Sequence, residues 1–305
     1  MSAIKIAGAP ISWGVCEVPG WGYQLDPERV LSEMGSAGLT ATELGPEGFL
    51  PAEPAELTTL LGRHGLSCVG SFAPVVLHDA DHDPVPDIAG VLESLVAIGG
   101  GQERSDPGSK TGSMLVLAAA TGTDGYDSRP DLDDEQWATL LTNLDRLAAV
   151  AAERGITAVL HPHVGTMVEK GDEVARVLAG SSISLCLDTG HLLIGGTDPL
   201  QLARAMPGRI AHAHLKDVDA KLAACVQSGE LTYTEAVAEG MYTSLGTGDV
   251  DIAGIVKALR DNGFDGWFVL EQDTILDREP QGQGPLRDVL ASVAYLQRIA
   301  GSVPA

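Results

Sequence analysis

Residues 183–191 have the sequence ISLCLDTGH, and this stretch decides the fold that we expect for the whole chain. It is a short apolar run that ends abruptly in an acid, a turn and a histidine. Alternating β-branched and apolar residues of this kind predict a strand that is buried on both faces of a parallel sheet. Because α/β folds place their chemistry at the carboxyl ends of such strands, Asp188 and His191 are candidate site residues.

Three further stretches follow the same pattern. Residues 156–163 (ITAVLHPH) end in two histidines, residues 210–217 (IAHAHLKD) in two histidines, a lysine and an acid, and residues 267–273 (WFVLEQD) in two acids. Side chains two positions apart on a strand share a face, so the histidines within each stretch point the same way. Side chains that can do chemistry therefore collect at the ends of four successive predicted strands.

The rest of the chain alternates strand patterns with amphipathic helical patterns. Further strands are predicted at residues 4–11, 40–44, 67–73 and 114–120, and the predicted helices end at glycines such as Gly38, Gly65 and Gly155. Eight strand–helix units in 305 residues average about 38 residues each, which is typical of a (β/α)8 TIM barrel. We predict one TIM-barrel domain over residues 1–305, with a polar excursion at about residues 218–248 after the seventh strand.

A doubly wound α/β sheet is the alternative fold. Such a sheet usually carries a glycine-rich phosphate-binding turn after its first strand. Residues 7–14 (AGAPISWG) do not form that pattern, so the barrel is favoured.

Composition narrows the classes of function. The formal net charge is −23, which argues against binding to nucleic acid or to anionic membranes. No apolar run approaches the length of a membrane span, and the first residues do not have the layout of a signal peptide. The four cysteines are widely spaced and form no CxxC pair, which indicates free thiols in a reducing compartment. We therefore expect a cytoplasmic protein that acts on a small molecule, with homo-oligomerisation left open.

Two histidines and two carboxylates are predicted to meet at one point. The carboxyl ends of adjacent barrel strands converge, and the candidate metal ligands at those ends are His161, Asp188, His214 and Glu271. This set of nitrogen and oxygen donors suits a divalent cation with open positions for substrate oxygens. Manganese or cobalt is favoured, and zinc, iron or magnesium are alternatives. Hydrogen-bonded core histidines are the alternative interpretation, which accounts poorly for five histidines near successive strand ends.

Other side chains at strand ends are candidate substrate contacts. Trp13 follows the first strand and Glu43 the second, with core packing as the alternative for Trp13. Pro162 has no N–H to donate to a sheet, so the fifth strand should end near it. His163 is therefore expected in a loop, where it would face substrate or solvent.

Several motifs resemble those of a known family. CLDTGH (residues 186–191), AHAHLKD (211–217) and VLEQD (269–273) are similar to the strand-end motifs of the xylose isomerase-like barrel superfamily. Within it, HPHVGT (161–166), ELGPEGFLP (43–51) and EAVAEGMYTSLGTGDVD (235–251) resemble the inosose dehydratase branch. The superfamily usually binds metal through a glutamate, an aspartate, a histidine and a glutamate. Asp188, His214 and Glu271 match the last three, whereas His161 stands in place of the first glutamate.

The resemblance implies a metal-dependent lyase that removes water from a neutral cyclic keto-polyol in inositol catabolism. The expected substrate is 2-keto-myo-inositol (scyllo-inosose). The resemblance also implies that His191 and Lys216 lie near the substrate. Lys216 is then a candidate base and His163 or His191 a candidate acid. An ion pair with Asp217 or with a carboxylate in the barrel lumen is the alternative for Lys216.

Other activities stay open on the sequence alone. A ketose 3-epimerase or isomerase would use the same metal but would place one base on each side of its substrate. One of these bases is usually the first glutamate ligand, and His161 stands in its place here, which favours elimination. A β-eliminase acting on a 3-keto-glycoside would use the same chemistry on another ring. A sugar- or metal-binding barrel without activity is the non-enzymatic alternative, and the retention of Lys216 beside the candidate ligands argues against it.

Overall fold

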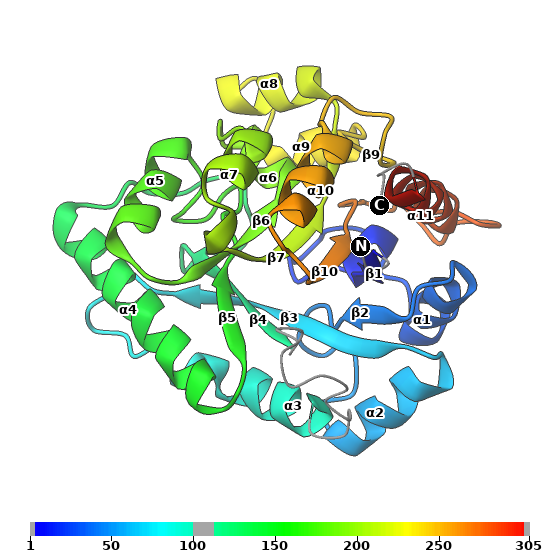
Figure 1. Ribbon diagram of the computed structural model, residues 1–305, viewed down its shortest axis with the longest axis horizontal. Helices are drawn as coiled ribbons and strands as arrows, with labels where there is room; N and C mark the ends of the chain where they lie inside the picture. The colour runs from blue at the N-terminus through cyan, green and yellow to red at the C-terminus, as the bar shows by residue number, and fades with distance from the viewer. Residues whose placement is uncertain (1–3, 100–112, 302–305) are drawn as a thin grey trace.

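The computed structural model describes residues 4–99 and 113–301. Within these residues, eight parallel strands close into a barrel in the order β1-β10-β7-β6-β5-β4-β3-β2 (Figure 1). The predicted TIM barrel is therefore confirmed. The barrel strands are β1 (Lys5–Gly8), β2 (Ala41–Glu43), β3 (Ser67–Val76), β4 (Met114–Ala120), β5 (Thr157–Leu160), β6 (Ser184–Asp188), β7 (Ile210–Leu215) and β10 (Trp267–Leu270).

Helices connect successive strands and surround the barrel (Figure 1). Side chains cap the first turns of several of these helices, as in α1, where the Asp26 carboxylate accepts a hydrogen bond from the Arg29 N–H. In α4, Asp133 and Gln136 form a reciprocal capping box. The helices of the outer layer are α1 (Pro27–Ser36), α2 (Pro54–Arg63), α3 (Ala89–Gly99), α4 (Asp134–Glu153), α5 (Gly171–Gly180), α7 (Pro199–Ala205), α10 (Ile252–Asp261) and α11 (Leu286–Gly301).

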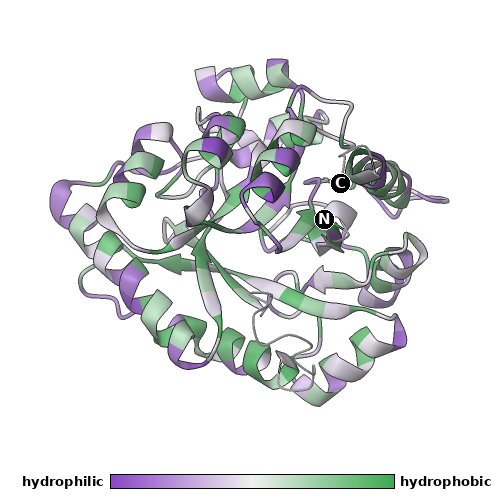
Figure 2. Ribbon diagram, viewed as in Figure 1, coloured by the Kyte–Doolittle hydropathy of each residue, from purple (hydrophilic) through white to green (hydrophobic). Residues whose placement is uncertain are grey.

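The alternation of side chains along each strand separates the core from the site. On β6, Leu185 and Leu187 belong to the large apolar core between strands and helices. Cys186 and Asp188 alternate with them and face the barrel lumen, where Cys186 packs against Val116 of β4 and its neighbours. Figure 2 shows hydrophobic colour along the central strands and hydrophilic segments along the surrounding helices. The lumen therefore receives one side chain from every second position of a strand.

Strand β5 ends earlier than the apolar run that predicted it. Its last residue is Leu160, and Pro162 cannot continue the ladder because it has no N–H. The N–H of His161 still donates to the Leu117 carbonyl of β4, at 2.8 Å. His161 thus stays fixed beside the barrel while His163 lies in the following loop, as expected.

The excursion after β7 is more ordered than its polar sequence indicated. It contains α8 (Ala220–Ser228), α9 (Tyr233–Ala238) and an antiparallel pair of short strands, β8 (Asp217–Val218) and β9 (Tyr242–Thr243). Its buried side chains form a second apolar cluster with Trp21 from the β1 loop and Val164 from the β5 loop. The excursion is therefore packed onto the open end of the barrel.

Asp217 ties this excursion to the barrel. Its carboxylate is fully buried and accepts four backbone N–H bonds, with Oδ1 bound by Val218 and Val250 and Oδ2 by Gly246 and Gly248. A Cβ atom at Gly248 would lie 2.4 Å from Asp217 Oδ1, so a side chain there would push the loop off its anchor. Asp217 therefore faces away from Lys216 and is used for anchoring the loop.

Two further expectations concern thiols and membranes. Cys16, Cys68, Cys186 and Cys225 all lie in the described residues and are free, as predicted. Residues 4–99 and 113–301 contain no helix that is both long and apolar enough to cross a membrane.

Candidate active site

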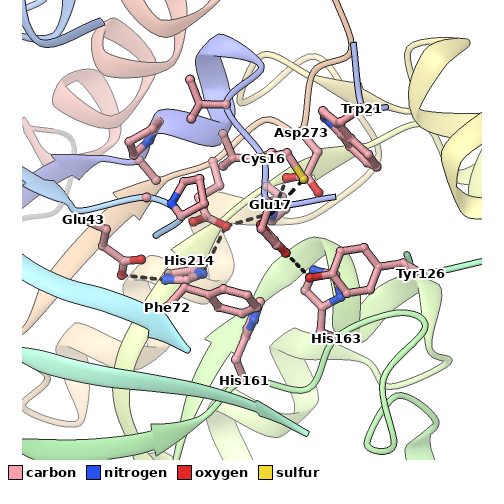
Figure 3. Close-up of a pocket in the computed structure, with 18 of the residues that line it drawn as sticks. Cys16, Glu17, Trp21, Glu43, Phe72, Tyr126, His161, His163, His214 and Asp273 are labelled. Carbon is pink, nitrogen blue, oxygen red and sulfur yellow. Dashed lines mark hydrogen bonds and ion pairs between the residues drawn. The ribbon is translucent and has the colours of Figure 1, made fainter. Parts of the chain in front are cut away.

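A cavity lies at the carboxyl ends of the barrel strands (Figure 3). Most of the predicted site residues line it, together with side chains that the sequence analysis did not single out. The polar and aromatic lining consists of Glu17, Trp21, Glu43, Phe72, Tyr126, His161, His163, His214, Lys216, Tyr233, Glu271 and Asp273.

Three predicted metal ligands come together beside this cavity. Asp188 ends β6, His214 lies on β7 and Glu271 follows β10, and one donor atom from each lies within 4.8 Å of the others. His214 Nδ1 is 3.1 Å from Glu271 Oε2 and 3.7 Å from Asp188 Oδ2. Although burial would raise the pKa of Glu271, the charges of His214 and Lys216 lower it to about 2. The site therefore holds ionised oxygen donors next to a ring nitrogen.

The two oxygens of Asp188 have different partners. Oδ1 caps the short helix α6 (Thr189–Ile194) by accepting the N–H groups of Gly190 and His191, at 2.9 and 2.8 Å. Oδ2 faces the candidate metal site. A Cβ atom at Gly190 would lie 2.8 Å from both Lys216 Cβ and Tyr242 Cε1, so only glycine fits. The DTGH motif thus encodes a helix start that also aims one carboxylate oxygen into the lumen.

Glu43 lies behind His214, on the side away from the other candidate ligands. Its Oε1 accepts hydrogen bonds from His214 Nε2 at 2.9 Å and from His212 Nε2 at 2.7 Å. Burial would raise the pKa of Glu43, but the charge of His214 and the hydrogen bonds from both histidines lower it far below its usual range. Since Nε2 of His214 is occupied by Glu43, Nδ1 is the nitrogen that remains for a metal.

His161 contacts the candidate ligands through Asp188. Its Nε2 lies 3.2 Å from Asp188 Oδ2, and its ring packs edge-on against that of His214. Its Nδ1 is buried and has no hydrogen-bond partner within the described residues. From this position the His161 ring can serve as a fourth metal ligand, or it can donate a hydrogen bond that orients Asp188.

Lys216 lies among three carboxylates. Its Nζ forms ion pairs with Asp273 Oδ1 and, at 2.9 Å, with Glu271 Oε2, and it is 3.8 Å from Asp188 Oδ2. Thr189 Oγ1 accepts the Lys216 N–H at 2.8 Å and donates to the Lys216 carbonyl at 2.7 Å, which fixes the backbone. Burial would lower the pKa of Lys216, but the three carboxylates raise it well above its usual value. In this arrangement Lys216 is an ammonium group paired with lumen carboxylates and not with Asp217, so it is placed to donate a proton and not to act as the expected base.

His163 and His191 form a stacked pair, with ring centroids 3.6 Å apart. Nδ1 of His163 donates to the Val164 carbonyl at 2.7 Å, whereas Nδ1 of His191 accepts the Val164 N–H at 3.3 Å. Burial and neighbouring positive groups hold the pKa of both rings well below the usual value, so both are neutral. Their Nε2 atoms therefore differ, an acceptor on His163 and a donor on His191. His163 lines the cavity and His191 lies behind it.

Trp13 is not brought to the cavity. The chain after β1 turns into the short helix η1 (Pro10–Trp13), which directs this side chain into the main core. Trp13 is fully buried, and its Nε1 donates to Glu33 Oε2 of α1 at 2.8 Å. The aromatic residue from this loop that does line the cavity is Trp21, whose Nε1 donates to the Thr274 carbonyl at 3.1 Å.

Six of the polar and aromatic cavity residues were not among the predicted site residues: Glu17, Trp21, Phe72, Tyr126, Tyr233 and Asp273. Asp273 binds Lys216 through Oδ1 and accepts a hydrogen bond from the Tyr233 hydroxyl at Oδ2. Tyr126 donates its hydroxyl to Glu17 across the cavity mouth, and its ring lies 4.3 Å from that of His163 (Figure 3). Asp273 was detectable, because it is two positions after Glu271 and so shares its face. Phe72 lies on β3 and Tyr233 on α9. Glu17, Trp21 and Tyr126 lie in loops, where no periodicity indicates the direction of a side chain.

Comparisons with known proteins identify the family to which this barrel belongs. A sequence model of the family described as xylose isomerase-like TIM barrel matches residues 109–296. The rhizopine catabolism protein MocC of Rhizobium meliloti is 32% identical over 99% of this chain and 90% of its own length. The chain belongs to the xylose isomerase-like TIM barrel family.

Two further proteins are similar to this chain over almost their whole length. An inosose dehydratase of Erwinia tasmaniensis is 31% identical over 98% of both chains. The crystal structure of the IOLI protein with a bound zinc atom superposes with a TM-score of 0.69, at 14% identity, over 99% of this chain and 100% of that one. At that identity the superposition shows the shared fold.

The residues of this family member fit a divalent cation. The Asp188 and Glu271 carboxylates face His214 Nδ1, a buried nitrogen with no hydrogen-bond partner in the described part of the chain. Glu43 holds the opposite nitrogen of the same ring, which is the usual support for a metal-binding histidine. Oxygen and imidazole donors of this kind suit manganese, cobalt, iron or zinc.

Proposed function

We propose that this protein is a hydro-lyase that dehydrates an inosose, with 2-keto-myo-inositol as the expected substrate. The similarity to inosose dehydratases over 98% of the chain carries this proposal. The cavity supports it, because donors for a divalent cation, a lysine and a histidine face one shared space.

Dehydration next to a ketone requires two proton transfers. The hydrogen on the carbon α to the ketone leaves as a proton, the C–O bond to the β-hydroxyl breaks, and that hydroxyl leaves as water after gaining a proton. When bound by Asp188, His214 and Glu271, a divalent cation supplies positive charge that stabilises negative charge developing on the ketone oxygen. Manganese or cobalt is the preferred ion in this proposal.

Lys216, His163 and His191 carry the proton transfers in this proposal. Lys216 and His163 line the cavity, so they are placed to touch the substrate. His191 stacks behind His163 and lies 3.8 Å from Asp273 Oδ2, so it acts through these neighbours. Burial of all three keeps bulk water from competing for the transferred protons.

The substrate is uncharged in this proposal. Four carboxylates line the cavity, those of Glu17, Glu43, Glu271 and Asp273. Lys216 also lines it, but its ammonium group is already paired with carboxylates. A phosphate group would meet net negative potential. A neutral polyol offers hydroxyl groups that carboxylates and histidines can bind.

The free thiols further support a cytoplasmic location.

An assay of the purified protein tests the proposal. The protein is supplied with manganese, cobalt or zinc, or treated with a chelator, and offered scyllo-inosose, a 3-keto-glucoside and a free ketohexose. We expect enone absorbance to grow with inosose and a divalent ion, and to disappear with the chelator. Conversion of the ketohexose alone would identify an epimerase, and full activity after metal removal would refute the metal-dependent chemistry.

A further inference from the structure

Lys216 lies against the same oxygens that would hold a metal ion. Its Nζ is 2.9 Å from Glu271 Oε2 and 3.8 Å from Asp188 Oδ2. His214 Nδ1 faces these same two oxygens at 3.1 and 3.7 Å. An ammonium group and a divalent cation would therefore compete for one pair of carboxylates, and their like charges would repel each other.

Asp273 offers the ammonium group another partner. It is 6% exposed, and its Oδ1 forms an ion pair with Lys216 Nζ. Its other oxygen, Oδ2, accepts the hydroxyl proton of Tyr233. Because Tyr233 occupies one oxygen, the carboxylate is held with the remaining oxygen toward Lys216.

Tyr233 is delivered by the excursion after β7. It is the first residue of α9, and Thr232 and Glu235 fix the start of that helix through a capping box. Tyr233 is 2% exposed, its hydroxyl is 3.1 Å from that of Tyr242, and its ring packs near Trp21. The hydroxyl therefore has a fixed position relative to the barrel.

We propose that Asp273 and Tyr233 form a docking site for the Lys216 ammonium group, which draws it away from Glu271 and Asp188 and thereby strengthens metal binding. Both act as positioning residues, and neither is a metal ligand. The excursion thus contributes to the metal site without donating a ligand. This inference goes beyond the proposed function, because it holds for any divalent cation bound by these ligands and for any substrate.

Manganese dissociation constants, measured without substrate by competition with a chelating dye, test the inference. Tyr233→Phe removes one hydrogen bond and no charge, so we expect about fivefold weaker binding. Asp273→Asn removes the charge-assisted contact and should weaken binding by about 30-fold. Tyr126→Phe is the matched control, since it removes a tyrosine–carboxylate hydrogen bond, to Glu17, that does not involve Lys216, and its manganese binding should match that of the parent protein.

The Lys216→Met background separates this inference from a general loss of structure. Without the ammonium group, Tyr233→Phe should no longer change manganese affinity, and Asp273→Asn should change it less than in the parent protein. An equal effect of Tyr233→Phe in both backgrounds overturns the inference, as does unchanged binding by Tyr233→Phe and Asp273→Asn. A parent protein that binds no manganese also overturns it. A parent protein that shows the expected binding pattern but leaves inosose unchanged refutes the proposed function alone.

Discussion

Glu43 is predicted to control metal affinity although it is not a predicted ligand. The informative change is Glu43→Gln, which keeps the size of the side chain and removes its charge. The parent carboxylate accepts hydrogen bonds from His214 Nε2 at 2.9 Å and His212 Nε2 at 2.7 Å. In the variant, the amide oxygen can still accept these bonds, but it no longer fixes the ring of His214 as strongly.

The structure sets the expected magnitude. Loss of a carboxylate that orients a metal-binding histidine typically weakens metal binding by about 10- to 100-fold. Glu43→Ala should also lower folding stability. It removes two charge-assisted hydrogen bonds worth about 1.5 to 3 kcal/mol each, or about 3 to 6 kcal/mol in total. Gly70 leaves room for Glu43, since a Cβ atom there would lie 3.3 Å from Oε1. The glutamine therefore fits the same space.

Metal titration and thermal unfolding together test this reasoning. Manganese affinity is measured for the parent protein, for Glu43→Gln and for His212→Gln. His212 binds the same Glu43 oxygen as His214 but is not itself a candidate ligand, so His212→Gln should lower stability while keeping manganese affinity within about threefold of the parent value.

Two results would contradict the role of Glu43. Parent-like manganese affinity in Glu43→Gln would show that the charge behind His214 has no effect on Nδ1. An equal loss of affinity in His212→Gln would show that the effect comes from general disturbance of the lumen.

Four further predictions concern the site and its support. Alanine in place of Asp188, His214 or Glu271 should remove bound metal and activity while circular dichroism stays unchanged, and retained metal by elemental analysis would contradict the ligand assignment. His161→Glu should keep metal but lower the dehydration rate by about tenfold or more, and a parent-like rate would show that the histidine has no special role. The free keto-polyol should have a kcat/KM about 100-fold above that of a phosphorylated form, since like charges would repel the phosphate, and the reverse preference would refute the neutral-substrate proposal. Asp217→Ala should lower the free energy of unfolding in urea by about 3 kcal/mol or more, because four buried N–H groups lose their acceptor, and a loss below about 1 kcal/mol would contradict its anchoring role.

Much of the fold could be predicted because parallel barrel strands carry a strong signal. The apolar runs at β5, β6, β7 and β10 are short and end in polar residues, and the period of two along each run assigns faces. Asp188, His214 and Glu271 meet in the lumen for that reason. Strand periodicity thus predicted the part of the site that the strands themselves build.

The rest of the site depends on turns that the sequence does not report. Trp13 follows a strand directly, but the helical turn after Pro10 directs it to the core. Tyr233 is 17 residues beyond Lys216 along the chain, and it reaches the cavity because α9 folds back over the barrel. Lys216 was expected near the substrate, but its pairing with Asp273 requires two loops to meet. Such contacts are set by tertiary packing, which local patterns do not encode.

The anchoring of the excursion has a consequence for which changes of sequence this chain can accept. Residues 217–250 begin and end at one carboxylate, that of Asp217, which binds the N–H groups of both Val218 and Val250. The segment between carries its own apolar cluster and closes with the β8–β9 pair. It is therefore a cassette whose two ends are fixed side by side on the barrel. Insertions or exchanges within it can reshape the roof of the cavity while the strand ends below keep their ligands, so new substrate preferences can evolve here without rebuilding the catalytic floor.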